Sequence, residues 1–433
     1  MSPTFRSLSI YNYRLYWTGA LVSNIGTWMG RVSQDWLVLT DLTHHSSTDL
    51  GTVTALQFLP LVLLAPWAGA ITDRFPKRRI LFITQSALAV TSLLTGLLII
   101  TGVVQLWHIF ALAFLQGVAT AVDNPGRQTF VSEMVPRESL SNAVSLNSAS
   151  FNAARLIGPG VAGLVIAAVG TGPSFFVNTL SFVAVLLALW RMRTSELRPA
   201  PRTAGRGSIR EGARYVKNRP DIILIMVLVF MLGTFGMNFQ LTTALMATQV
   251  FHKGAGEYGL LGSIMAIGSL AGALLAARRA HPRLRILLIA LSGFAIATLV
   301  AATAPSYWMF AIFLVPTGLF SITVLTSANS MVQLGVDPAM RGRVMALYMA
   351  IFMGGTPIGA PVIGWIGDAF GARWTILIGT FAVAVSVVGA AAYLVRSENV
   401  HVRLVRDGLA GHGLPRFVLT KGQVTEPVPQ RAA

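Results

Sequence analysis

Long apolar stretches recur along nearly the whole chain, and they limit the possible folds more than any other feature. An α-helix of about 20 apolar residues crosses a bilayer core of about 30 Å. Stretches of this kind span residues 16–40, 50–71, 80–101, 107–123, 142–169, 174–190, 222–249, 258–277, 284–303, 307–332, 344–365 and 374–395. The sequence therefore predicts an all-α membrane protein with twelve transmembrane helices.

The composition excludes several other classes of protein. Only 11% of the 433 residues are charged, 54% are hydrophobic and the mean hydropathy is +0.65, which argues against a soluble enzyme and against a disordered chain. The chain has no cysteine, so disulfides, thiol nucleophiles and thiolate metal sites are excluded. It also lacks a phosphate-binding loop, so ATP is not the expected energy source. We expect no cofactor, no metal and no nucleic acid partner.

The basic residues predict the orientation of the chain in the membrane. The formal charge is +17, and short loops rich in Lys and Arg stay on the cytoplasmic side. The loops after the second, fourth, eighth and tenth stretches hold clusters of basic residues: Arg74, Lys77, Arg78, Arg79, Arg127, Arg137, Arg278, Arg279, Arg283, Arg285, Arg341 and Arg343. The loops on the opposite side contain only two basic residues, Lys253 and Arg373. We therefore expect a multi-pass protein of the cell inner (plasma) membrane with both termini in the cytoplasm.

A long segment containing many Arg and Pro residues divides the chain into two halves of six helices. The predicted domains are a cytoplasmic N-terminus (1–15), an N-terminal six-helix bundle (16–190), a basic cytoplasmic central loop (191–220), a C-terminal six-helix bundle (221–395) and a cytoplasmic tail (396–433). A shift of 201 residues places Gly158 on Gly359, Gly163 on Gly364 and Leu146 on Leu347. Internal repeats of this kind are typical of secondary transporters, although a chain with 41 glycines also offers chance coincidences.

The loop after the second stretch carries a spaced motif. Its residues are Gly69, Asp73, Arg74, Lys77 and Arg78, with Pro76 at the position of a second glycine. This pattern resembles the loop motif of the major facilitator superfamily. The resemblance implies a gate that ties the two halves together on the cytoplasmic side, whereas a loop that only sets the orientation would need the charges alone.

The fifth stretch contains Gly158, Pro159 and Gly163. This segment resembles the Gly-Pro motif that the superfamily shows in exporters, with Ala162 and Gly163 standing where two glycines are usual. Proline with glycine can bend a helix in a bilayer, and small residues let helices approach closely. The motif therefore favours a helix bend that sets the direction of transport, and ordinary close packing is the alternative.

Three ionisable residues lie well inside the predicted spans. Placing a charged side chain in a bilayer costs free energy, so such residues usually have a function. Arg31 and Asp35 are four residues apart on one helix face, and Arg155 lies near the middle of the fifth stretch. We expect Asp35 to carry the transported proton, with Arg31 and Arg155 favouring its ionised form. A static ion pair that holds helices together is the alternative.

The fourth stretch departs from the superfamily. Gln116 and Gly117 resemble the fourth-helix motif, but Ala113 stands where the family has an arginine linked to proton transfer. Either Arg155 or Arg31 replaces that arginine, or coupling works differently. The nearby Asp123 and Arg127 are four residues apart and indicate a gate or a loop anchor.

Polar and aromatic side chains within the spans could line a substrate cavity. We select nine of them: Asn24, Trp28, Gln34, Gln57, Gln116, Asn147, Asn238, Phe239 and Asn329. A mixed amide and aromatic lining suits a small amphipathic molecule.

Several phrases of the sequence resemble a narrower group, the bacterial exporters that include enterobactin exporters and macrolide efflux pumps. They lie at residues 36–39, 123–128, 142–144, 155–159 and 341–345. The resemblance implies proton-driven efflux of a drug, antibiotic or siderophore by a monomer through alternating access. A proton-coupled nutrient importer and, more distantly, a membrane-embedded enzyme or lipid-handling protein are the alternatives.

Overall fold

The computed structural model describes residues 3–198, 209–278, 283–338, 340–398, 400–405 and 416–421. The described helices are α1 (Tyr11–Trp36), α2 (Ser47–Leu63), α3 (Ala65–Arg74), α4 (Lys77–Ile100), α5 (Leu106–Met134), α6 (Arg137–Val169), α7 (Thr171–Arg191), α8 (Ile209–Lys217), α9 (Pro220–Met231), α10 (Phe239–Leu245), α11 (Ala255–Ala277), α12 (Leu284–Thr303), α13 (Tyr307–Gly335), α14 (Arg341–Phe370) and α15 (Ala372–Glu398). Two strands, β1 (Val400–Val405) and β2 (Arg416–Lys421), pair antiparallel after α15.

Among the described residues, ten helical segments are long and apolar enough to cross a membrane. The pair α2 and α3, bent by 61°, brings the number to eleven. α1 occupies the first predicted span and continues into a π-helical turn at Leu37–Leu42. α1 carries Arg14, Arg31 and Asp35 together with several Asn, Ser and Thr residues, and these lower its hydropathy. The predicted span 222–249 is divided into α9, α10 and two π-helical turns, Leu232–Gly236 and Met246–Val250.

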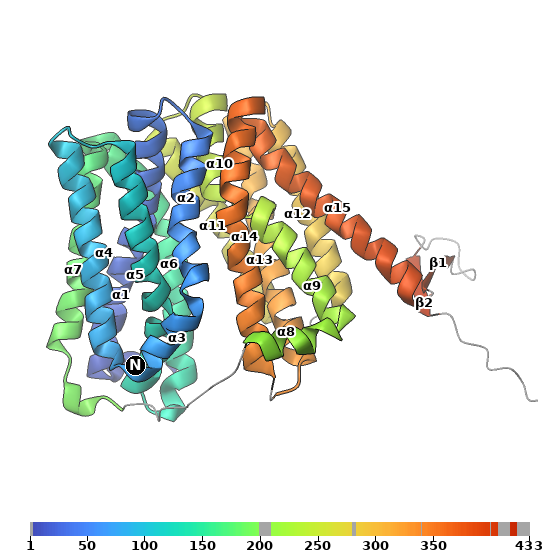
Figure 1. The fold of residues 1–433 in the computed structure, drawn as a ribbon, viewed down its shortest axis with the longest axis horizontal. Coiled ribbons are helices and arrows are strands. Elements are labelled where there is room, and N and C mark those ends of the chain that lie inside the picture. The colour runs from blue at the N-terminus through green and yellow to red at the C-terminus, as the bar shows by residue number, and fades with distance from the viewer. Residues whose placement is uncertain are drawn as a thin grey trace, which may run out of the picture.

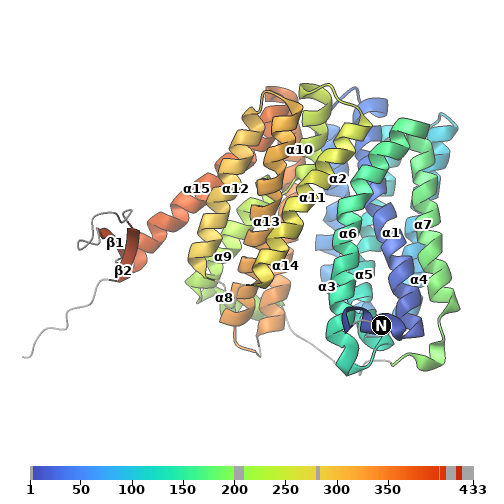
Figure 2. The same cartoon turned by 180° about the vertical axis from the view of Figure 1, so that it is seen from behind.

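The helices form two groups that lie side by side (Figures 1 and 2). α1 to α7 pack on one another in the first helix group, and α8 to α15 pack on one another in the second. Small residues bring the helices of a group close together. A Cβ atom on Gly26 of α1, for example, would lie 2.5 Å from the Cβ atom of Ser181 on α7.

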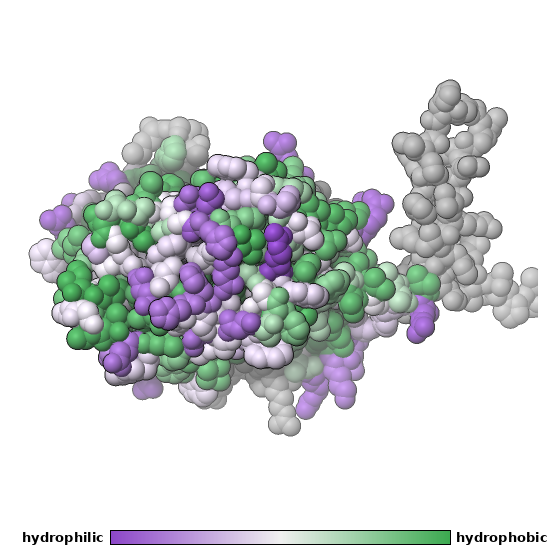
Figure 3. All heavy atoms as spheres, turned by 90° about the horizontal axis from the view of Figure 1, so that it is seen from above, coloured by the Kyte–Doolittle hydropathy of each residue, from purple (hydrophilic) through white to green (hydrophobic). Residues whose placement is uncertain are grey.

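The two ends of the molecule differ in charge. We call the end that holds the N-terminus the basic end, because its loops contain Arg74, Arg79 and Arg341 (bottom of Figure 1). The other end is called the neutral end. Figure 3 views the neutral end, where polar side chains gather across the face and hydrophobic side chains lie around its rim.

The two helix groups contact each other mainly through α2 with α14 and α6 with α11. These helices meet toward the neutral end, and the groups diverge toward the basic end (Figure 1). We call the contacts near the neutral end the seam. The structure is therefore closed at the neutral end.

Residues 201 positions apart have equivalent surroundings. A Cβ atom on Gly163 of α6 would meet backbone at the start of α11, and one on Gly364 of α14 would meet backbone at the start of α2. The two helices also end alike, at Gly170 with φ 86° and Gly371 with φ 95°, a backbone conformation that favours glycine. These matched environments explain the spacing of the glycines in the sequence.

Two predicted regions are described only in part. Within the predicted central loop 191–220, α8 packs against α14, and the Arg343 guanidinium lies 3.1 Å from the Glu211 carboxylate. Residues 199–208 of that loop and residues 399, 406–415 and 422–433 of the predicted tail lie outside the described residues.

Candidate functional site at the seam

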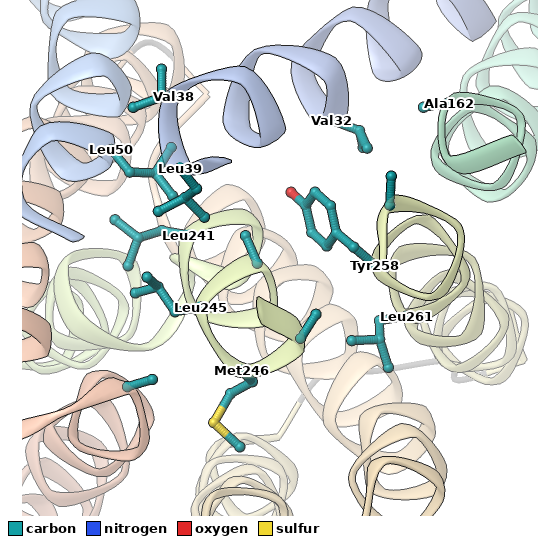
Figure 4. Close-up of a cluster of buried hydrophobic side chains, with 14 of the residues drawn as sticks. Val32, Val38, Leu39, Leu50, Ala162, Leu241, Leu245, Met246, Tyr258 and Leu261 are labelled. Carbon is teal, nitrogen blue, oxygen red and sulfur yellow. The ribbon is translucent and has the colours of Figure 1, made fainter. Parts of the chain in front are cut away.

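Asp35 lies near the end of α1 that faces the seam and is only 7% exposed. The hydroxyl of Tyr258, on α11 of the second helix group, donates a 2.8 Å hydrogen bond to the Asp35 carboxylate. Figure 4 shows this hydroxyl directed toward α1. The Trp36 ring stacks on Tyr258 with 6.4 Å between the ring centroids. Asp35 thus connects the two helix groups through a buried hydrogen bond.

Arg31 and Arg155 meet over one aromatic ring. The Arg31 guanidinium lies 5.1 Å from the centroid of Trp28, and the Arg155 guanidinium lies 5.7 Å from the same centroid. Arg31 also lies 5.8 Å from the ring of Phe58 on α2. Within the described part of the chain, neither arginine forms a hydrogen bond or an ion pair. The structure therefore brings Arg31, Asp35 and Arg155 together, but Asp35 bonds to Tyr258 rather than to an arginine.

The segment with Gly158 and Pro159 forms the contact between α6 and α11. The Ser263 hydroxyl of α11 donates a 2.6 Å hydrogen bond to the Leu156 carbonyl of α6. A Cβ atom on Gly163 would lie 2.6 Å from the Ala255 carbonyl oxygen of α11, whereas one on Gly158 would lie 2.5 Å from the Cβ atom of Trp28 on α1. α6 runs unbroken from Arg137 to Val169, so in this conformation the glycines act as close-packing positions.

Asp368, near the end of α14, binds the start of α2 across the seam. Its carboxylate accepts hydrogen bonds of 2.7 Å from the Ser47 amide and 2.9 Å from the Thr48 amide. The first amides of a helix lack partners within the helix and carry the positive end of its dipole. Asp368 is therefore a cap supplied by one helix group to a helix of the other.

The predicted gate motif lies at the basic end. The Lys77 ammonium lies 3.1 Å from the Glu133 carboxylate of α5, and Arg78 donates to the carbonyl of Leu189 on α7 at 2.7 Å. Both partners belong to the first helix group. Asp73 and Arg74 are exposed, and a Cβ atom on Gly69 would meet nothing within 4 Å. In this conformation, the described contacts of Lys77 and Arg78 hold the first group together.

Asp123 and Arg127 form a buried network inside the first helix group. The Asp123 carboxylate accepts from the Thr84 hydroxyl at 2.6 Å, from the Gln85 amide at 2.8 Å and from Arg127 at 2.6 Å. Arg127 also donates to Asn24 on α1 at 3.1 Å. The network joins α1, α4 and α5 within the first helix group, and its described partners belong to helices rather than to a loop.

The predicted cavity residues fall into two sets. Three have partners within their own group: Asn24 bonds to Arg127, the Asn238 amide donates to the Thr234 carbonyl at 2.8 Å, and Asn329 accepts from Gln333 at 2.5 Å. The remaining polar positions are Gln34, whose buried amide nitrogen has no described partner, and the half-buried Gln57, Gln116 and Asn147. Phe239 packs edge-on against Phe294, beside a small recess in the second group.

Sequence reasoning missed Tyr258, Ser263 and Asp368. Each acts across the seam, and its partner lies more than 100 residues away in sequence. The paired Gly163 and Gly364 were the available signal, because they mark the helices that meet there. Among the described residues, no group of three or more His, Asp or Glu side chains is placed to hold a metal ion.

Two packed groups of apolar helices, joined at one end and diverging at the other around buried charges, define a multi-pass membrane transporter of the major facilitator type. The comparison with known families agrees. The chain belongs to the family described as transmembrane secretion effector, whose profile matches residues 2–404. The protein is accordingly a transporter and not an enzyme, and it lies in the bacterial inner membrane.

Similar proteins include several exporters. The staphyloferrin A transporter of Staphylococcus aureus is 26% identical over 381 residues, covering 87% of this chain and 94% of the relative. The multidrug efflux pump Tap of Mycolicibacterium fortuitum is 26% identical over 370 residues, covering 83% and 90%. Macrolide efflux protein A of Streptococcus pyogenes is 21% identical over 352 residues, covering 79% and 87%.

Solved structures share the fold at low sequence identity. A mutant of the nucleoside transporter NupG superimposes with a TM-score of 0.71 at 13% identity, covering 90% of this chain and 99% of that one. A bacterial homologue of the human lysosomal transporter Spinster, in an inward-facing and unoccupied conformation, gives a TM-score of 0.67 at 16% identity, covering 91% and 96%.

Proposed function

We propose that this protein exports a small amphipathic molecule, such as a drug, an antibiotic or a siderophore, in exchange for protons. The exporters among its relatives support efflux. The observation that carries the proposal is the buried Asp35 carboxylate, which bonds to Tyr258 of the opposite helix group. A titratable group at this position links its own protonation to the contact between the groups.

The proposal places the basic end in the cytoplasm, because positively charged loops are retained there. Twelve spans in two six-helix domains, 16–190 and 221–395, then leave both termini inside. The described conformation is closed toward the outside and corresponds to the state that receives substrate from the cytoplasm. One chain supplies both helix groups, so the transporter works as a monomer.

Alternating access requires the seam to open and the basic end to close. Opening separates Asp368 from the start of α2 and Tyr258 from Asp35. Closure at the other end lets the exposed Asp73 and Arg74 of the gate motif contact the second helix group. Gly163 packs tightly on α11 and Gly158 packs tightly on α1, so a bend or shift of α6 at this segment would separate the groups.

Protons enter this cycle at Asp35. In the closed seam, the Tyr258 hydroxyl donates to the Asp35 carboxylate, so this contact ties Asp35 to the second helix group. Opening the seam removes this donor and exposes the carboxylate to the outside, where it takes up a proton. Closing the seam restores the donor, and the proton leaves toward the cytoplasm.

The test is transport by purified protein in liposomes under an imposed pH gradient, with a panel of fluorescent amphipathic dyes. We expect dye to move against the direction of proton flow, and the movement to stop when an ionophore removes the gradient. Dye movement in the same direction as the protons would contradict export by antiport.

A further inference from the structure

Two half-buried arginines share a site in which neither has an ion-pair partner among the described residues. The guanidinium groups of Arg31 and Arg155 lie 5.1 and 5.7 Å from the centroid of Trp28, and no described residue forms an ion pair with either. Trp28 attracts both cations through its ring face and holds them near each other despite their repulsion. The Trp28 ring therefore lies within cation–aromatic range of both guanidinium groups.

The local charges do not balance. Two arginines face one carboxylate, Asp35, whose oxygen already accepts from Tyr258 at 2.8 Å. Uncompensated charge inside a membrane protein is costly and usually marks the path of a substrate or ion. An anion with two or more oxygens matches the planar donors of arginine.

We propose that the exported molecule carries an anionic group, a carboxylate, phosphate or sulfonate, which binds between Arg31 and Arg155 beside Trp28. The inference rests on the proposed export function and names the class of its substrate. It favours anionic amphipathic molecules over cationic drugs, because a cation would meet two positive charges at this position.

The location of the pair supports access from the cytoplasm. Arg155 precedes Leu156, whose carbonyl accepts the seam hydrogen bond from Ser263. Arg31 lies four residues before Asp35, about 6 Å along α1 toward the basic end. Both arginines thus lie on the basic-end side of the seam contacts of Asp35 and Leu156, and both are partly exposed.

Tyr258 keeps the protein's own carboxylate away from the proposed anion site. Asp35 and Arg31 are four residues apart on one helix, a spacing at which side chains of opposite charge pair. Tyr258 withdraws with α11 when the seam opens, and Asp35 then turns to Arg31 and displaces the substrate anion outward. Protonation of Asp35 from outside breaks this pair, and the arginines become free for the next anion.

Binding of two matched dyes tests the site. Fluorescein and rhodamine 6G share a xanthene ring system but carry opposite charges, and their affinities are read by fluorescence anisotropy on protein in phosphatidylcholine nanodiscs. We expect fluorescein to bind wild type more tightly than rhodamine 6G. Equal or tighter binding of rhodamine 6G, or no binding of fluorescein, overturns the proposal.

Substitutions locate the dye. Arg31→Gln and Arg155→Gln should each weaken fluorescein binding about tenfold, as loss of one charge-assisted hydrogen bond does. Arg14→Gln removes an exposed arginine from the same helix and should change nothing. Unchanged fluorescein affinity in both Arg31→Gln and Arg155→Gln overturns the proposal.

A second pair of variants tests the competition without touching the arginines. Tyr258→Phe frees Asp35 to pair with Arg31, so fluorescein binding should weaken by about tenfold. Adding Asp35→Asn to Tyr258→Phe removes the competing charge and should restore the affinity. If the double variant binds fluorescein no better than Tyr258→Phe, the competition is absent.

The two proposals fail separately. Arg31→Gln and Arg155→Gln could both keep gradient-driven export and bind fluorescein as wild type does. That result would support export and rule out the anion site. Alternatively, fluorescein binding could depend on both arginines while the protein moves no dye under a pH gradient. That result would support the anion site and rule out proton-driven export.

Discussion

Single residues inside the spans differ mainly in whether they have partners. Asp123 and Arg127 are satisfied by each other and by three neighbouring side chains, so their charges stabilise one helix group. Arg31 and Arg155 contact aromatic rings and form no hydrogen bond or ion pair with any residue that the structure describes. Buried polar groups without partners are costly in folding, which is why they point to a function while satisfied groups point to structure.

The Asp123 network gives a prediction about stability. Asp123→Asn leaves the Arg127 charge without its carboxylate, and breaking a buried pair in this way costs about 3 kcal/mol in the free energy of unfolding. Unfolding by SDS in mixed micelles measures the change. Glu196→Gln breaks an exposed pair with Arg193 and should cost less than about 1 kcal/mol. Equal effects of the two substitutions would contradict an anchoring role for the network.

The spacing of residues in the sequence predicted part of this site, and the rest depends on contacts between residues far apart in the sequence. The four-residue interval predicted that Arg31 and Asp35 share a helix face, which the structure shows. It did not reveal that Asp35 bonds to Tyr258, because a contact over 223 residues depends on how the two groups pack. Arg155 was selected for its depth in the membrane, and only the fold places it beside Trp28.

At the scale of helices, apolar length and glycine spacing predicted most of the arrangement. The 201-residue shift matches α6 to α14, and both helices end at a glycine with positive φ. Hydropathy missed the bend between α2 and α3 and the division of the span 222–249 into α9 and α10, because apolar side chains fill these segments too. It likewise gave no sign that Asp368 of α14 caps α2, since a cap between distant helices has no local pattern.

The Asp368 cap gives a prediction about conformation. Asp368→Asn removes a charge from the start of α2, which weakens the closed seam by about 1 kcal/mol and shifts the population about fivefold toward the state open at the neutral end. The chain has no cysteine, so Val103→Cys and Thr303→Cys place two spin labels at this end, one on each helix group, without background. Electron spin resonance then measures the distance between the labels.

A matched control separates the cap from a general effect of charge. Asp49 lies in the same first turn of α2, and Asp49→Asn removes a carboxylate there. This control should leave the distribution of distances between the labels unchanged. A longer distance in Asp49→Asn, or no lengthening in Asp368→Asn, would show that the cap does not hold the seam.

The whole molecule combines an apolar exterior with basic loops at one end and a seam at the other. Its charge of +17 follows from these loops and needs no nucleic acid partner to explain it. The family and the similar structures establish the transporter fold, and the exporters among the relatives support outward transport. The central claim is that protonation of Asp35 controls the contact between the two helix groups.

The most direct test compares Asp35→Asn with wild type in two transport modes. Gradient-driven export needs a residue that binds and releases protons, whereas exchange of labelled for unlabelled substrate across liposomes with no pH gradient needs only the moving helices. We predict that Asp35→Asn loses gradient-driven export and retains exchange. Gradient-driven export at the wild-type rate in Asp35→Asn would contradict the account.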